Sequence, residues 1–173
     1  MTKAKFSMAS ALLIAISVPL AQASPKKDPG ATLQDLEQSA FDAARQADSL
    51  SVAYDLSWET HSGYLNSLRD DINRMGRDLR SLDDRFDSLV PWQKQAVNKV
   101  EPMLKDAAAN TGHAIDFLNE HRYELWSGDY HGYITSLFDE SRQIADTLKD
   151  YLKYAKAHNQ EQQLKETLGG GLQ

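Results

Sequence analysis

The chain has 173 residues, a formal net charge of −6 and no cysteine. This length suits one domain, and a chain without cysteine has no thiol nucleophile, thiolate metal site, disulfide or covalently attached haem. Acidic and basic residues are interspersed, with no basic stripe that would neutralise phosphates, so we expect no nucleic-acid partner.

The first 23 residues have the pattern of a cleaved secretory signal. Lys3 and Lys5 precede the apolar run 8–20 and the small-residue motif Ala21-Gln22-Ala23. The run is shorter than the ~20 residues that span a bilayer, so we expect no membrane span here. Cleavage after Ala23 predicts an exported protein, periplasmic or secreted. Loss of the two lysines changes the net charge from −6 to −8, which disfavours an anionic membrane surface.

Residues 24–31, SPKKDPGA, have no periodicity and are predicted to be a flexible leader. A helix is predicted from Thr32, which can cap it, with Asp35 three residues later. Its apolar residues recur at steps of three and four, as a helix that faces a partner requires. They are Leu33, Leu36, Ala40, Ala43, Ala47, Leu50 and Tyr54.

The second predicted helix has a stricter apolar seam, in which every step is three or four residues. It comprises Leu65, Leu68, Ile72, Met75, Leu79, Leu82, Phe86 and Leu89. The charged residues between these positions, Asp71 among them, are predicted to form a solvated outer face. Three pairs have the spacing of ion pairs along a helix: Asp70–Arg74, Arg74–Asp78 and Arg80–Asp84.

Pro91 is placed to end the second helix and begin a third, in which Pro102 predicts a kink near 98–101. The third seam runs through Ala96, Val100, Met103, Ala107, Thr111, Ala114, Leu118, His121 and Leu125. Gly128 and Asp129 predict a break and a new cap. The fourth seam runs through Tyr130, Ile134, Leu137, Ser141, Ile144, Leu148, Tyr151, Ala155 and His158, and residues 169–173 are predicted to be a disordered tail.

These patterns predict an all-α domain over residues 32–168, an elongated up-down-up-down four-helix bundle with coiled-coil-like seams. No alternating run with hairpin residues predicts a strand. The first connection is ambiguous, because Gly63 is the only residue there that breaks helices. We favour a break between Leu56 and Thr60, with Ser57 as the new cap. The alternative is a three-helix bundle in which the first two helices are fused into one long rod.

Counting residues from the turn at Val90 brings a set of histidine and aromatic residues to one end of this bundle. His61 lies 29 residues before Val90 and His121 lies 31 after it, so antiparallel helices place them at the same level. The candidate ligand end comprises Trp58, His61, His121, Tyr123, Trp126, Tyr130 and His131.

This end has three interpretations. His61, His121 and His131 with Glu124 are candidate ligands of a divalent metal. Histidines among aromatic rings can also hold haem b or a small apolar ligand. We favour the third interpretation, in which these side chains pack and cap the bundle end, and therefore predict no cofactor. In mid-bundle, Asn110, Thr111 and Ser141 predict a polar layer, either a ligand pocket or a hydrogen-bonded layer that fixes register.

No nucleophile motif, phosphate-binding loop or His-Glu-x-x-His sequence occurs. We therefore expect a non-enzymatic exported protein, an adaptor or envelope-associated factor that binds an unknown protein partner, as a monomer or as a homodimer. The alternative is a carrier of a small ligand, a metal ion or haem b that uses the histidine end.

Overall fold

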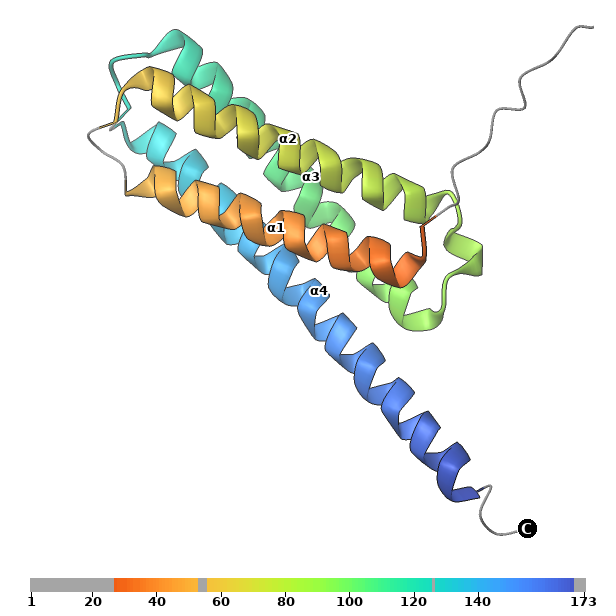
Figure 1. The fold of residues 1–173 in the computed structure, drawn as a ribbon. Helices are drawn as coiled ribbons and strands as arrows, with labels where there is room; N and C mark the ends of the chain where they lie inside the picture. The colour runs from red at the N-terminus through yellow and green to blue at the C-terminus, as the bar shows by residue number, and fades with distance from the viewer. Residues whose placement is uncertain (1–26, 53–55, 126, 170–173) are drawn as a thin grey trace, which may run out of the picture.

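The computed structural model describes residues 27–52, 56–125 and 127–169. These form four helices, α1 (Pro29–Ser51), α2 (Trp58–Asp83), α3 (Pro91–Glu120) and α4 (Gly128–Gly169), and a short 3₁₀ helix, η1 (Phe86–Ser88) (Figure 1). The all-α four-helix prediction is confirmed, and the fused three-helix alternative is wrong. The predicted signal, 1–23, lies outside the described residues. No helix in the described ranges combines the length and apolar character needed to cross a membrane.

The helices form a ring in which each packs on its neighbours along the chain, and α4 closes the ring against α1. The apolar seams face inward as predicted: Leu68, Ile72, Leu79 and Leu82 are all buried, and Phe86 in η1 is half-buried against the core. The seam of α1 is rich in alanine, and Ala40, Ala43 and Ala47 are completely buried. Such small side chains let a neighbouring helix backbone approach closely.

Local caps set the helix starts, and two of them differ from prediction. α1 begins at Pro29, three residues before the predicted Thr32, because the Asp28 carboxylate accepts a hydrogen bond from the backbone N–H of Ala31 and proline suits a first turn. α4 is capped by Ser127, whose Oγ accepts from Tyr130 N at 3.3 Å, and not by Asp129. Ser57 caps α2 as predicted, accepting from Thr60 N at 3.4 Å.

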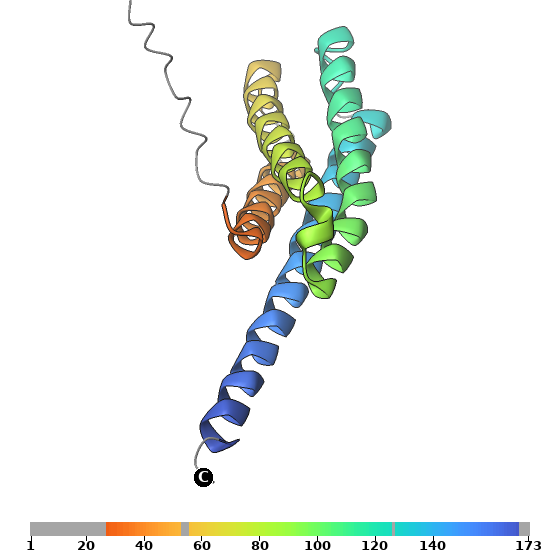
Figure 2. The ribbon, with the colours of Figure 1, turned by 90° about the vertical axis from the view of Figure 1, so that its right-hand side faces the viewer.

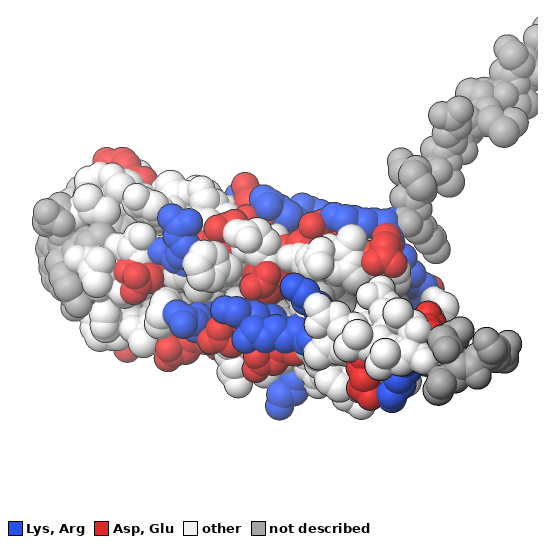
Figure 3. Space-filling model, turned by 60° about the horizontal axis from the view of Figure 1, so that its bottom comes forward, with Lys and Arg blue, Asp and Glu red and all other residues white. Residues whose placement is uncertain are grey.

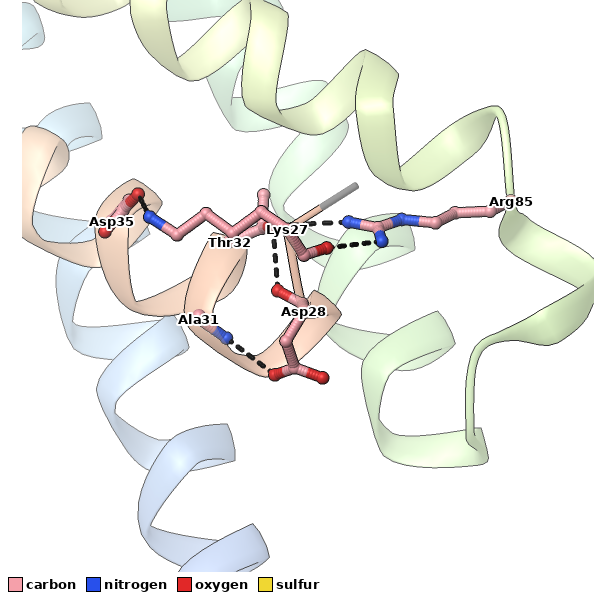
Figure 4. Close-up of polar contacts among 6 residues, drawn as sticks. All are labelled: Lys27, Asp28, Ala31, Thr32, Asp35 and Arg85. Atoms are coloured by element: carbon pink, nitrogen blue, oxygen red, sulfur yellow. Dashed lines mark hydrogen bonds and ion pairs between the residues drawn. The ribbon is translucent and has the colours of Figure 1, made fainter. Parts of the chain in front are cut away.

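α2 ends at Asp83, although the apolar seam was predicted to continue as helix to Leu89. The chain instead forms η1, in which Ser88 Oγ donates to Arg85 O at 2.7 Å. Val90 precedes a proline and is therefore extended, which leaves no room for another helical turn. Arg85 then fastens this loop to the start of α1, where its guanidinium donates to Lys27 O and to Thr32 Oγ1 (Figure 4).

Asp71 was predicted to lie on the outer face of α2, and this prediction is wrong. Its side chain is only 7% exposed and accepts a 2.6 Å hydrogen bond from Gln46 Nε2 of α1. Arg74 supplies a second partner at 3.1 Å. Asp71 is therefore a polar link between α1 and α2 at the edge of the core.

The three ion pairs predicted along α2, Asp70–Arg74, Arg74–Asp78 and Arg80–Asp84, do not form among the described residues. The acid partner of Arg74 is Asp71, and Arg80 Nε donates to Gly76 O.

α4 extends well beyond the other helices. Its 42 residues span about 63 Å at ~1.5 Å per residue, and its lower half stands clear of the bundle in both views (Figures 1 and 2). Leu148 is its last fully buried residue, Ala155 is half-buried, and His158, predicted as a seam residue, is exposed. We call residues 153–169 the arm.

Candidate functional site

The predicted histidine end exists, and it is tightly packed. His61 and His131 line one small cavity with Tyr130, and His121 ends α3 beside them. The placement of these histidines at one end of the bundle is therefore confirmed. The cavity has a volume of about 10 Å³, which accommodates at most one water molecule. A cavity of this size does not hold haem.

A buried pair of side chains joins α2 to α4 at this end. His61 is 3% exposed and Tyr130 is 2% exposed, and His61 Nδ1 lies 2.9 Å from Tyr130 Oη. Burial raises the pKa of Tyr130 above its ordinary value of 10, so the phenol keeps its proton. The hydroxyl can donate to or accept from the imidazole, according to the tautomer. Phe117 packs beside Tyr130, and the geometry is that of a hydrogen-bonded core layer.

The remaining candidates surround this pair without converging on a common point. His121 stacks on Phe117 with ring centroids 4.5 Å apart, and the Arg122 guanidinium lies 4.4 Å from the Trp58 ring. Tyr123 is 85% exposed, and Glu124 is exposed in the turn after α3. No group of three or more His, Cys, Asp or Glu in the described ranges is arranged to hold a metal ion. Trp126 lies outside the described residues.

The mid-bundle polar residues are partly linked, and the link was not predicted in this form. Asn110 Nδ2 donates to Glu140 Oε1 at 2.7 Å, which joins α3 to α4. Thr111 donates to Ala107 O within its own helix, and the completely buried Ser141 Oγ has no hydrogen-bond partner. Burial raises the pKa of Glu140 to about 7, and the nearby carboxylates Asp106 and Asp139 act in the same direction. Glu140 could not be singled out from the sequence, because it lies beside the seam and next to another acid, Asp139.

A large groove lies at the opposite, basal end, where α4 leaves the bundle. It has a volume of about 1130 Å³ and runs between the first turns of α1, the start of α3 and the lower part of α4. Six side-chain amides line it, and we call it the amide groove: Gln34, Gln38, Gln93, Asn159, Gln160 and Gln163. Trp92 adds an aromatic surface, the α4 wall carries Lys149, Lys153 and Lys156, and the α1 wall carries Asp28 and Glu37.

A second hollow adjoins the amide groove at Trp92, which lines both. This aromatic groove, of about 320 Å³, is lined by Pro91, Trp92, Gln95, Asp150, Tyr151 and Tyr154. Trp92 and Tyr151 are half-buried, whereas Tyr154 at the top of the arm is 57% exposed. Asp150 and Lys153 form an ion pair at 3.7 Å on the ridge between the two grooves.

The surface charge of this molecule is mixed. Figure 3 shows basic and acidic side chains interspersed on the face that it displays, with no extended region of one sign. Within the amide groove itself the two signs lie on opposite walls. A partner in this groove therefore meets donors, acceptors and both charges, and not a field of one sign.

Sequence reasoning missed the basal grooves because their walls come together only in three dimensions. Gln38, Trp92 and Gln163 are far apart along the chain, and each one reads as an ordinary polar or aromatic residue of a helix. One signal was available. Asn159 and Gln163, in the Asn/Gln-rich run 159–163, continue the bundle-facing side of α4 with polar residues, which indicates that this part of the helix has left the core.

No protein-family model, curated protein or solved structure matches this chain.

Proposed function

We propose that this protein is a non-enzymatic, exported interaction protein that binds an extended segment of a partner protein in the amide groove. The observation that supports the proposal is the lining of the groove, six side-chain amides beside one tryptophan. A side-chain amide carries two N–H donors and a carbonyl acceptor, the same groups that an extended polypeptide backbone offers. Within the groove, Gln93 Oε1 already accepts from Val90 N and Gln38 Nε2 donates to Asp42 Oδ2, so the other amides are the more available ones. Trp92 supplies a flat apolar surface for one side chain of the bound segment.

The size and charge of the groove support the same kind of partner. Its volume of about 1130 Å³ exceeds the usual range of a small-molecule site, and the groove is open along its length. Lysines on the α4 wall and acids on the α1 wall favour a segment that carries both charges, or neither, over a polyanion. Export, and hence a periplasmic or secreted partner, rests on the predicted signal in residues 1–23.

Site-specific photo-crosslinking in the producing cell tests the proposal. A photoreactive residue at Gln38, inside the groove, should give one discrete adduct, whereas the same residue at Asn66, exposed on α2, should give none. Trp92→Ala should reduce the Gln38 adduct while leaving the far-ultraviolet circular dichroism spectrum unchanged. Equal adducts at both positions, or no adduct at Gln38, would overturn the proposal.

The carrier alternative is tested separately on the purified mature protein. A visible spectrum and a metal analysis suffice, because haem gives a Soret band and a structural or transported metal is present in stoichiometric amount. Either finding would replace the interaction proposal with a carrier function at the histidine end.

A further inference from the structure

The aromatic groove gathers three aromatic rings and one carboxylate between two helices. The start of α3 supplies Trp92, and the part of α4 where the arm begins supplies Asp150, Tyr151 and Tyr154. Its volume of about 320 Å³ lies at the lower end of the range of small-molecule sites, roughly 300–1,000 Å³. The groove therefore suits a small ligand better than a segment of polypeptide.

The charge of the aromatic groove has one sign. Asp150 is the only charged residue among the six that line it, whereas the amide groove carries both acids and lysines. The Asp150 carboxylate lies 3.7 Å from the Lys153 ammonium, and these side chains are 79% and 67% exposed. An exposed ion pair of this kind contributes little. Asp150 therefore remains available to a cation in the groove.

The aromatic rings are placed to act together with this carboxylate. Trp92 and Tyr151 are half-buried and pack against the hydrophobic core, which holds both side chains in place. Tyr154, which is 57% exposed, follows Tyr151 by three residues and so lies on the same side of α4. The face of an aromatic ring carries partial negative charge and attracts a cation, most strongly for tryptophan. The lining thus favours a positively charged ligand over a neutral or anionic one.

The start of α3 adds little positive charge to the groove. The free N–H groups of a helix N-terminus normally repel a cation. Pro91, the first residue of α3, has no N–H, and the backbone N–H groups of Gln93 and Lys94 donate to Val90 O at 3.0 and 3.1 Å. The Lys94 ammonium donates to Asp87 O in η1 and does not line the groove. The attraction of Asp150 is therefore not cancelled by α3.

We propose that the aromatic groove binds a small organic cation, with a quaternary ammonium group against Trp92, Tyr151 and Tyr154 and with Asp150 as its counter-ion. Such a group has no N–H donors, and its methyl groups can contact the ring faces while its charge interacts with them. A hard metal ion instead needs several converging oxygen ligands, and Asp150 is the only carboxylate in this lining. The proposal adds a ligand site to the proposed function, which concerns the amide groove.

Calorimetric titration of the purified mature protein tests the charge of the ligand. Choline is the probe, and its control is the uncharged analogue of the same shape, in which carbon replaces the nitrogen. At constant ionic strength, choline should bind saturably at one site and at least about tenfold more tightly than the analogue, because only the cation interacts with the rings and the carboxylate. Equal affinities of the two compounds, or no saturable binding of choline, would overturn the proposal.

Two charge variants test the counter-ion. Asp150→Asn should weaken choline binding about fivefold, as expected for the loss of one opposite charge near the protein surface. Asp146→Asn is the matched control, because it removes the same charge from α4 at a position that pairs with Arg142 and does not line the groove. It should leave choline binding unchanged. Equal effects of the two variants would refute Asp150 as the counter-ion.

Substitution of Tyr154 tests the ring contact without disturbing the core, because this side chain is exposed. Tyr154→Phe keeps the ring and should retain the affinity for choline. Tyr154→Leu keeps an apolar side chain without a ring face and should weaken choline binding about two- to fivefold. Full retention of choline binding by Tyr154→Leu would contradict the role of the ring.

The source of the ammonium group is a separate question, since choline occurs free and as a lipid headgroup. Sedimentation with phosphatidylcholine vesicles distinguishes the two sources. Vesicle binding that free choline competes away would assign the headgroup, whereas choline binding without vesicle binding would assign a free solute, and both results support the site. Asp150, Tyr151 and Tyr154 do not line the amide groove, so choline binding and the Gln38 adduct can fail independently.

Discussion

Tyr130→Phe removes one hydroxyl from the packed histidine end and leaves the ring in place. The ring keeps its packing beside Phe117, with centroids 5.9 Å apart, and beside His61, at 5.6 Å. What is lost is the 2.9 Å hydrogen bond between Tyr130 Oη and His61 Nδ1, both in side chains that are 3% exposed or less. A net hydrogen bond contributes about 0.5–1.5 kcal/mol, and a buried group left without that bond costs ~1–3 kcal/mol.

We therefore expect Tyr130→Phe to lower the free energy of unfolding by about 1–3 kcal/mol. Urea unfolding followed by circular dichroism measures it, and an unchanged m-value would show that the compactness of the two states is unaffected. Tyr123→Phe is the matched control, because Tyr123 is 85% exposed, and it should change the stability by less than ~0.5 kcal/mol. If both substitutions had the same small effect, the hydrogen bond would not contribute to the stability of this end.

Four further predictions concern the core, the link between α1 and α2 at Asp71, the polar link in mid-bundle and the N-terminus. Leu79→Ala should lower the free energy of unfolding by ~2–5 kcal/mol, because it truncates a buried side chain. Asp71→Ala should lower it by ~1–3 kcal/mol, because Gln46 loses its hydrogen-bond partner between α1 and α2. Urea unfolding measures both effects, and an unchanged stability of Asp71→Ala would contradict the buried link. The pKa of Glu140, about 7 in the folded protein, lies above its unfolded value near 4.5. The protonated side chain therefore contributes fully to the free energy of unfolding below pH 4.5, and this contribution is lost as the pH rises through 7. Partial exposure limits this loss to about 1–2 kcal/mol, and Glu140→Gln should flatten the pH profile of thermal unfolding over that range, whereas an unaltered profile would refute the assignment. Intact-mass analysis of the exported protein should give a chain that starts at Ser24, and a mature form that retains residues 8–20 would refute the signal assignment.

The fold follows from the sequence because each helix repeats its apolar residues at steps of three and four. The run from Leu65 to Leu82 defines the packed face of α2, and Ser57 marks its start correctly. The ends were less predictable. α2 stops at Asp83 because serine and aspartate side chains and the residue before Pro91 favour turns, while the apolar spacing alone continues to Leu89.

The site was only half predictable. Register counting placed His61, His121 and Tyr130 correctly, since antiparallel helices of similar length bring equal counts to the same level. The partners of Asp71 and Glu140 were not predictable, because a charged residue beside a seam becomes buried or exposed according to helix rotation. In the arm, the apolar residues from Tyr154 to Leu168 lie away from the packed face of α4, and this change was present in their spacing. The spacing of the fourth seam also continues along the packed face as far as His158, so the spacing alone does not show where the apolar face changes sides.

We propose that partner binding takes place at the basal end and not at the histidine end. One crosslinking experiment compares the two ends directly, with the same photoreactive residue at Gln38 in the amide groove and at Tyr123, which is exposed beside the histidines. We expect a discrete partner adduct from Gln38 that Trp92→Ala weakens, and none from Tyr123. An adduct from Tyr123 alone would contradict this proposal and assign partner binding to the histidine end.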